Sequence, residues 1–188
     1  PLQFQGNFLP ASATSQVNYG INLPSLPQTN AYIPTTPNSE LLNPADFSVG
    51  NDPTIAGAGV VVGQDVSTFV NETIDGGSVT IYDAIGTPAN LQLRWAKVDS
   101  VAAGGTDTWE LFYQTDATAT GTNPAWINSN ISFAFDANGQ LNPPVTTIPL
   151  TGVTINTTTI GNLNISAPTG GITQFANTSG VATVNNLQ

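Results

Sequence analysis

The sequence predicts an all-β fold, either an antiparallel β-sandwich or a small β-barrel of about six to eight strands with long loops. Apolar and polar residues alternate in short runs, clusters of Gly, Asn, Asp and Pro separate these runs, and no long window has apolar residues at helical spacing. The chain has 188 residues, of which 39% are hydrophobic, enough for one domain with its own core. We therefore expect residues 1–188 to form a single β domain. Because the first residue is Pro1 and not Met, we expect this domain to be a fragment of a longer chain.

The main strands are predicted within residues 78–166. Residues 78–83 and 90–98 alternate in polarity and are separated by a turn at 83–88, and residues 108–113 alternate in the same way after a loop that contains Gly104 and Gly105. Residues 131–135 run into the turn sequence Asp136-Ala137-Asn138-Gly139, after which we expect another short strand. Two Thr-, Ile- and Val-rich runs, 145–150 and 158–166, complete this set.

The first third of the chain has a different character. Residues 13–23 alternate strictly, with Val17, Tyr19, Ile21 and Leu23 on one face, and predict an edge strand. Residues 24–55 are interrupted by Pro and rich in Asn, so we expect a long surface loop excursion. Residues 56–63 are Gly-rich and apolar, which favours a loop or an irregular strand.

The composition argues against catalysis. The chain has no Cys, His or Met, and only 7% of its residues are charged. Without His there is no side chain that ordinarily titrates near neutral pH, and without Cys there is no thiolate nucleophile or soft metal ligand. We therefore predict no enzyme activity, no catalytic residues, no cofactor and no metal site.

The charge limits the partners. Arg94 and Lys97 are the two cationic side chains against twelve acidic ones, giving a net charge of −10. Nucleic acids and anionic membranes are bound largely through Lys and Arg, so we expect neither as a partner. Arg94 and Lys97 would lie on opposite faces of one strand, and Glu110 on the facing strand is a plausible ion-pair partner.

Several local patterns have both a functional and a structural interpretation. Gly57-Ala58-Gly59 resembles part of a phosphate-binding loop and residues 136–139 the start of a calcium loop, but both lack the surrounding pattern, so we interpret them as a loop and a turn. Five carboxylates could form a pair for glycoside hydrolysis, but most fall in predicted turns, where Asp is common for structural reasons: Asp83, Asp99, Asp107, Glu110 and Asp116. Trp95, Trp109 and Trp126 could stack on a sugar, although the alternation places Trp95 and Trp109 on core faces.

An ordered set of segments resembles the middle domain of the bacterial flagellar hook protein. The segments are Val79-Thr80-Ile81-Tyr82-Asp83-Ala84-Ile85-Gly86, Leu91-Gln92-Leu93-Arg94-Trp95-Ala96-Lys97, Thr108-Trp109-Glu110-Leu111-Phe112-Tyr113, 132–141 and 172–181. One departure follows Gly86, where Thr87-Pro88-Ala89-Asn90 stands in place of the Asn and His that relatives often carry.

The resemblance implies a structural, outer β domain in a helical tube of identical subunits. This tube, the hook, is the flexible universal joint between motor and filament. The resemblance also implies an extracellular location and export without a cleaved signal peptide. We expect the isolated fragment to be monomeric and residues 24–55 to be the main contact region with other copies. The alternative is an extracellular adhesin or surface-layer β-sandwich that binds carbohydrate or protein through a concave site with exposed aromatic side chains.

Overall fold

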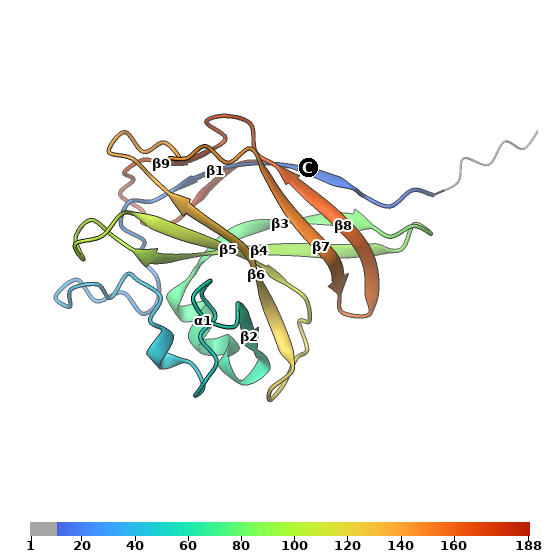
Figure 1. Ribbon diagram of the computed structural model, residues 1–188, viewed down its shortest axis with the longest axis horizontal. Helices are drawn as coiled ribbons and strands as arrows, with labels where there is room; N and C mark the ends of the chain where they lie inside the picture. The colour runs from blue at the N-terminus through green and yellow to red at the C-terminus, as the bar shows by residue number, and fades with distance from the viewer. Residues whose placement is uncertain (1–10) are drawn as a thin grey trace, which may run out of the picture.

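Two β-sheets packed against each other make up the structure, a computed structural model that describes residues 11–188 (Figure 1). The all-β sandwich predicted from the sequence is confirmed. Among the described residues, no helix has the length and apolar character needed to cross a membrane.

One sheet is antiparallel and contains the predicted hairpins. Its strand order is β2 (Val60–Val62), β6 (Pro124–Ala134), β5 (Thr108–Gln114), β4 (Pro88–Asp99) and β3 (Ile74–Tyr82). The turn between β3 and β4 forms as expected, because Asp83 accepts hydrogen bonds from the backbone N–H groups of Ile85 (2.9 Å) and Thr87 (2.8 Å). We call this sheet the hairpin sheet.

The other sheet brings together the two ends of the described chain. Its strands are β10 (Thr183–Leu187), β1 (Gln16–Leu23), β8 (Thr158–Ser166) and β7 (Thr147–Ile155), and β9 (Ile172–Gln174) also pairs with β1. β1 is antiparallel to β10 but parallel to β8 and β9. The prediction that residues 13–23 form an edge strand is therefore wrong: β1 has hydrogen-bonded neighbours on both sides, because β9 and β10 supply strands that were not predicted. We call this sheet the mixed sheet.

The main core lies between the two sheets. It contains the alternating residues that the sequence placed on one face: Val17, Tyr19, Ile21, Leu23, Leu91, Leu93, Trp95, Trp109 and Leu111. The indole N–H of Trp95 donates to the Tyr19 hydroxyl (2.9 Å), which donates to the carbonyl of Gly76 (2.7 Å), so the polar atoms of these two core side chains are satisfied.

A second apolar cluster lies on the other face of the hairpin sheet. There Phe112, Ala96 and Trp126 alternate with the residues of the main core and pack against Phe69 of the helix α1 (Val66–Glu72). Residues 24–59 cover this cluster. They contain no strand and one short 3-10 helix, η1 (Pro44–Asp46), but Leu42 and Phe47 are buried in the cluster. The segment predicted as a surface excursion thus packs on the second cluster and covers it. A second short 3-10 helix, η2 (Gly63–Asp65), links β2 to α1.

The strand count also differs from the prediction. Residues 11–188 contain ten strands, of which β2 and β9 have three residues each. The strand expected after Gly139 is reduced to two isolated bridges, Phe135 with Leu141 and Gln140 with Thr173. The Asp136–Gly139 turn itself forms, with Gly139 at a positive φ of 73°.

Candidate functional site

Buried carboxylates gather where residues 24–59 meet the hairpin sheet. Asp65 in η2, Glu72 at the end of α1 and Glu110 on β5 are all buried. Each accepts hydrogen bonds from the covering segment, whose irregular backbone has N–H groups without a strand partner. This arrangement attaches the cover to η2, to α1 and to β5, at three points that we call the carboxylate anchors.

The first anchor is Asp65, which holds residues 48–51. Its carboxylate accepts the hydroxyl of Ser48 (2.5 Å), the backbone N–H of Ser48 (3.3 Å) and the side-chain amide of Asn51 (2.9 Å). These bonds close the loop that follows Phe47, so the aromatic ring stays in the second cluster.

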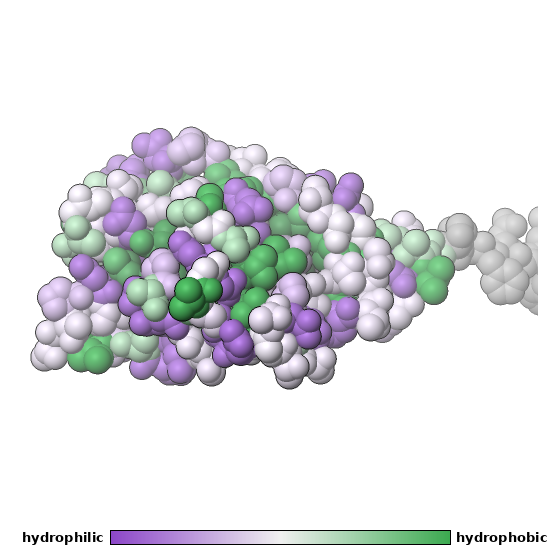
Figure 2. Space-filling view, turned by 60° about the horizontal axis from the view of Figure 1, so that its bottom comes forward, coloured by the Kyte–Doolittle hydropathy of each residue, from purple (hydrophilic) through white to green (hydrophobic). Residues whose placement is uncertain are grey.

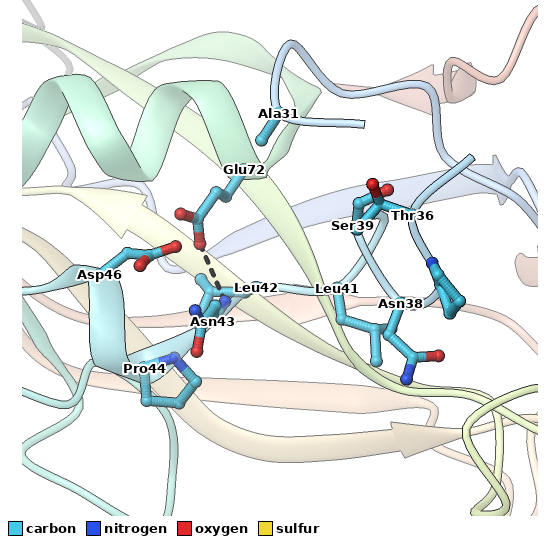
Figure 3. A pocket seen from close by; sticks show the side chains of 11 residues that line it. Ala31, Thr36, Asn38, Ser39, Leu41, Leu42, Asn43, Pro44, Asp46 and Glu72 are labelled. Carbon is cyan, nitrogen blue, oxygen red and sulfur yellow. Dashed lines mark hydrogen bonds between the residues drawn. The ribbon is translucent and has the colours of Figure 1, made fainter. Parts of the chain in front are cut away.

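The second anchor is Glu72, whose Oε2 accepts the backbone N–H of Asn43 at 2.9 Å. Figure 3 shows its carboxylate and that of Asp46 near each other. They line a cavity of about 470 Å³ together with Ala31 and most of the residues between Thr36 and Pro44. Burial raises the pKa of Glu72 to about 7; the hydrogen bond from Asn43 opposes this rise and Asp46 adds to it. Glu72 is therefore partly protonated near neutral pH.

The third anchor is Glu110. It accepts the backbone N–H of Ile55 (3.3 Å) and the side-chain amide of Asn128 (2.7 Å), and Asn128 also donates to the carbonyl of Pro53 (3.2 Å). Burial raises the pKa of Glu110, and these hydrogen bonds counteract the rise. The role expected for Glu110 as an ion-pair partner is wrong, because its bonds go to the cover and to β6.

The two cations lie on opposite faces of β4, as predicted. Lys97 is buried at the end of the sandwich, where Nζ donates to the carbonyl of Ser25 (2.6 Å) and pairs with Asp107 (3.0 Å). Burial opposes the ionisation of Asp107, but the hydrogen bond and charge of Lys97 outweigh it and lower its pKa. Arg94 instead binds the end of α1 through Thr73 and the carbonyl of Val70.

The other candidate carboxylates serve turns. Asp83 and Asp116 accept backbone N–H groups of their own turns, and these bonds lower the pKa of both. Asp99 accepts the N–H groups of Ser100 and Thr106 in the β4–β5 loop. Within residues 11–188, no three acidic side chains come together as a metal site would require.

The remaining candidates also have structural roles. Gly57 and Gly59 lie in a turn just before β2. The backbone N–H of Asn128 on β6 donates to the Gly59 carbonyl (2.8 Å), and a Cβ at Gly57 would meet Asp52. Trp95, Trp109 and Trp126 are all buried. They cannot form the exposed aromatic platform considered from the sequence, and the cavity at Glu72 has no aromatic lining.

The anchors at Asp65 and Glu72 were not recognised from the sequence. The only signal was the spacing of Val66, Phe69 and Val70, which fits one face of a short helix. Such a short pattern does not reveal that Asp65 and Glu72 bind the covering segment.

The family model for the flagellar basal body protein FlaE D2 domain matches residues 65–186. The chain belongs to this family. No curated protein matches the chain.

Membership in the FlaE D2 family makes this a structural domain of a bacterial flagellar hook protein, which assembles with other copies into a polymer. The matched region begins at Asp65 and includes α1, β3 to β9 and most of β10. All three carboxylate anchors thus lie inside the matched region, whereas the segment they hold, residues 43–55, lies outside it.

Proposed function

We propose that this domain forms the outer part of the hook, the universal joint between motor and filament, outside the cell, and that its chain is exported without a cleaved signal peptide. The observation that carries the proposal is the family match over residues 65–186. The domain acts as a rigid body whose contacts with neighbouring copies change as the hook bends.

The packing supports rigidity. Both faces of the hairpin sheet are covered, one by the mixed sheet and the other by α1 and residues 24–59. Interiors packed on two sides resist deformation. Bending is therefore accommodated between copies of the domain.

The surface supports contacts that exchange. Figure 2 views the face that is at the bottom of Figure 1, where residues of intermediate hydropathy, drawn in white, separate small apolar and polar areas. With 7% charged residues overall, such a surface offers hydrogen bonds of modest net strength and few ion pairs that would fix one arrangement. We also propose that the domain carries no enzyme activity, since its buried carboxylates are engaged with backbone and amide groups.

An in-frame deletion tests this function. Asn18 and Gln188 exchange two backbone hydrogen bonds, so they lie side by side. In the full-length hook protein, a short Gly-Ser linker can therefore replace residues 18–188 and span the same short distance. Electron microscopy of the hooks and swimming assays should show exported subunits whose hooks are straight or fragile, and cells that do not swim. Normal hook curvature with normal swimming would contradict the proposal.

The oligomeric state gives a second test. Since the contacts are weak, the isolated domain should sediment as a monomer at micromolar concentration. A stable dimer would contradict exchangeable contacts.

A further inference from the structure

A groove beside the start of β3 combines the guanidinium of Arg94 with apolar side chains. It has a volume of about 410 Å³ and is lined by the cover (Gln28–Asn30), the end of α1, the start of β3, Arg94 and residues 181–184. Lys97 is buried and paired with Asp107, so among the described residues Arg94 is the cation that reaches an open cavity.

Arg94 has donor capacity to spare. Its Nε donates to Thr73 Oγ1 (2.7 Å), and its Nη2 donates to the carbonyls of Val70 (3.1 Å) and Thr73 (2.8 Å). No hydrogen bond within residues 11–188 uses Nη1, and no carboxylate there lies within 4.0 Å of the guanidinium. Asp75, opposite Arg94 in the β3–β4 ladder, also lines the groove and acts on Arg94 through its charge, and its Oδ1 accepts the N–H of Gly77.

One further feature of the groove indicates a protein ligand. Val181 and Val184, which line it, are 51% and 39% exposed. A ligand with one carboxylate beside an apolar side chain would contact both Arg94 and these two valines.

The turn between β3 and β4 has this chemistry. Asp83 uses Oδ1 for the bonds to Ile85 and Thr87, which leaves Oδ2 without a partner within residues 11–188. Ile85 beside it is 83% exposed, and Figure 1 shows the turn at the far tip of the β3–β4 hairpin.

We propose that the Arg94 groove of one copy binds the Asp83–Ile85 turn of a second copy. The Asp83 carboxylate accepts a hydrogen bond from Nη1 of Arg94, and Ile85 packs on Val181 and Val184. This inference rests on the proposed function, in which identical copies assemble.

Geometry and charge favour a second copy. The groove lies at the start of β3 and the turn follows its end, so the nine residues Ile74–Tyr82 separate the two surfaces. Two different surfaces on one molecule give a head-to-tail contact, which repeats into an open helical array when the rotation between copies does not close a ring. Copies of this chain, each with a net charge of −10, repel one another, and a contact between an acidic group of one and a cation of the next offsets part of this repulsion.

Cysteine cross-linking tests the contact directly, because the chain has no Cys. The full-length hook protein with both Ile85→Cys and Val181→Cys should form a ladder of disulfide-linked oligomers when assembled hooks are oxidised. Within one copy these positions lie near opposite ends of β3, beyond the Cα separation of about 7 Å that a disulfide spans. The matched control is Ile85→Cys with Val101→Cys, since Val101 is 68% exposed but lies in the β4–β5 loop.

The outcomes separate this contact from the proposed function. A ladder in the test pair and none in the control supports the contact. Equal ladders, or hooks that form normally without a ladder, overturn the contact and leave the proposed function standing. If the unmodified protein forms no hooks, both fail.

Charge variants give an independent measurement. Val181→Asp should reduce the yield of polymer from full-length subunits about two- to fivefold, whereas Val101→Asp should not. Asp83→Asn keeps an acceptor for the turn but removes the charge, so its reduction in yield should shrink as salt is raised. Unchanged yields in Val181→Asp and Asp83→Asn would overturn the contact.

Discussion

The two faces of the hairpin sheet are stabilised in different ways. The inner face packs against another sheet, and its apolar side chains form one large cluster that includes Trp95, Trp109 and Phe133. The outer face packs against an irregular segment, where a smaller apolar cluster is combined with the buried anchors Glu110 and Glu72.

The difference follows from what covers each face of the hairpin sheet. A sheet satisfies its own backbone groups, so a partner sheet needs only apolar contact. Residues 24–59 have no ladder, and their N–H groups must find acceptors elsewhere. The carboxylates supply these acceptors, and the covering segment depends on polar geometry as well as on apolar area.

The largest effect is expected from the inner face. Trp95→Ala should reduce the free energy of unfolding by about 3–5 kcal/mol, since it opens a cavity and leaves the Tyr19 hydroxyl without its donor. Trp126→Ala on the outer face should cost less, because the Trp126 indole N–H has no partner within residues 11–188 and its removal breaks no hydrogen bond. Urea unfolding followed by fluorescence and circular dichroism measures both. An equal or larger loss for Trp126→Ala would contradict the comparison.

The covering segment should open separately from the sandwich. Leu42→Ala should cost about 2 kcal/mol, at the lower end for a buried Leu, and should increase hydrogen exchange in residues 36–47 more than in β3 to β6. Leu93→Ala is the matched change on the inner face and should increase exchange throughout the hairpin sheet. Deletion of residues 30–45 should lower the free energy of unfolding, because it removes Leu42 from the cluster that contains Phe69 and Trp126 and so exposes these two side chains.

The turn at Gly139 packs closely against the backbone of β9 at Gln174. Gly139 and Gly152 have positive φ angles of 73° and 61°, but a Cβ at Gly139 would lie 2.2 Å from the carbonyl oxygen of Gln174, whereas nothing lies within 4 Å at Gly152. Gly152→Ala should therefore cost about 1 kcal/mol from the backbone conformation alone. Gly139→Ala should cost more, and similar melting temperatures for the two variants would show that β9 is not held against this turn.

The smallest effect concerns pH and the outer face. The pKa of Glu72 rises from its ordinary value of 4.5 to about 7 in the folded protein. The folded state then binds more protons than the unfolded state between these values, so the contribution of Glu72 to stability falls as pH increases from about 4.5 to about 7. Glu72→Gln should raise the melting temperature at pH 8 and make little difference at pH 4.

A neighbouring variant tests the cause of this shift. Asp46 adds to the raised pKa of Glu72, so Asp46→Asn should move the pH dependence to lower pH. A melting curve for Glu72→Gln that follows the unmodified protein from pH 4 to pH 8 would show that Glu72 is not buried in solution.

The inner face could be predicted because alternation reports burial directly. Leu91, Leu93 and Trp95 alternate with polar residues, and β4 follows that pattern. β9 and β10 could not be predicted, because β9 has three residues and the five residues of β10 include two consecutive Asn. Without them, β1 was predicted at an edge.

The outer face was harder to predict for a physical reason. Glu110 was recognised as a candidate, but its bonds to Ile55 and Asn128 join three separate parts of the chain. No local pattern encodes such contacts. Leu42 and Phe47 occur among Pro and Asn residues, and only the folded structure shows that they fill the second cluster.

The pairing of β1 with β10 determines how the domain would respond to tension. The two strands are antiparallel, with Tyr19 opposite Leu187 and Asn22 opposite Thr183. A pull on Asn18 and Gln188 in opposite directions therefore loads their shared hydrogen bonds one at a time, as in unzipping, instead of all together as in shearing. β10 would peel away first under a small force, since its residues are largely exposed. β1 would resist longer, because Val17, Tyr19, Ile21 and Leu23 are buried in the main core.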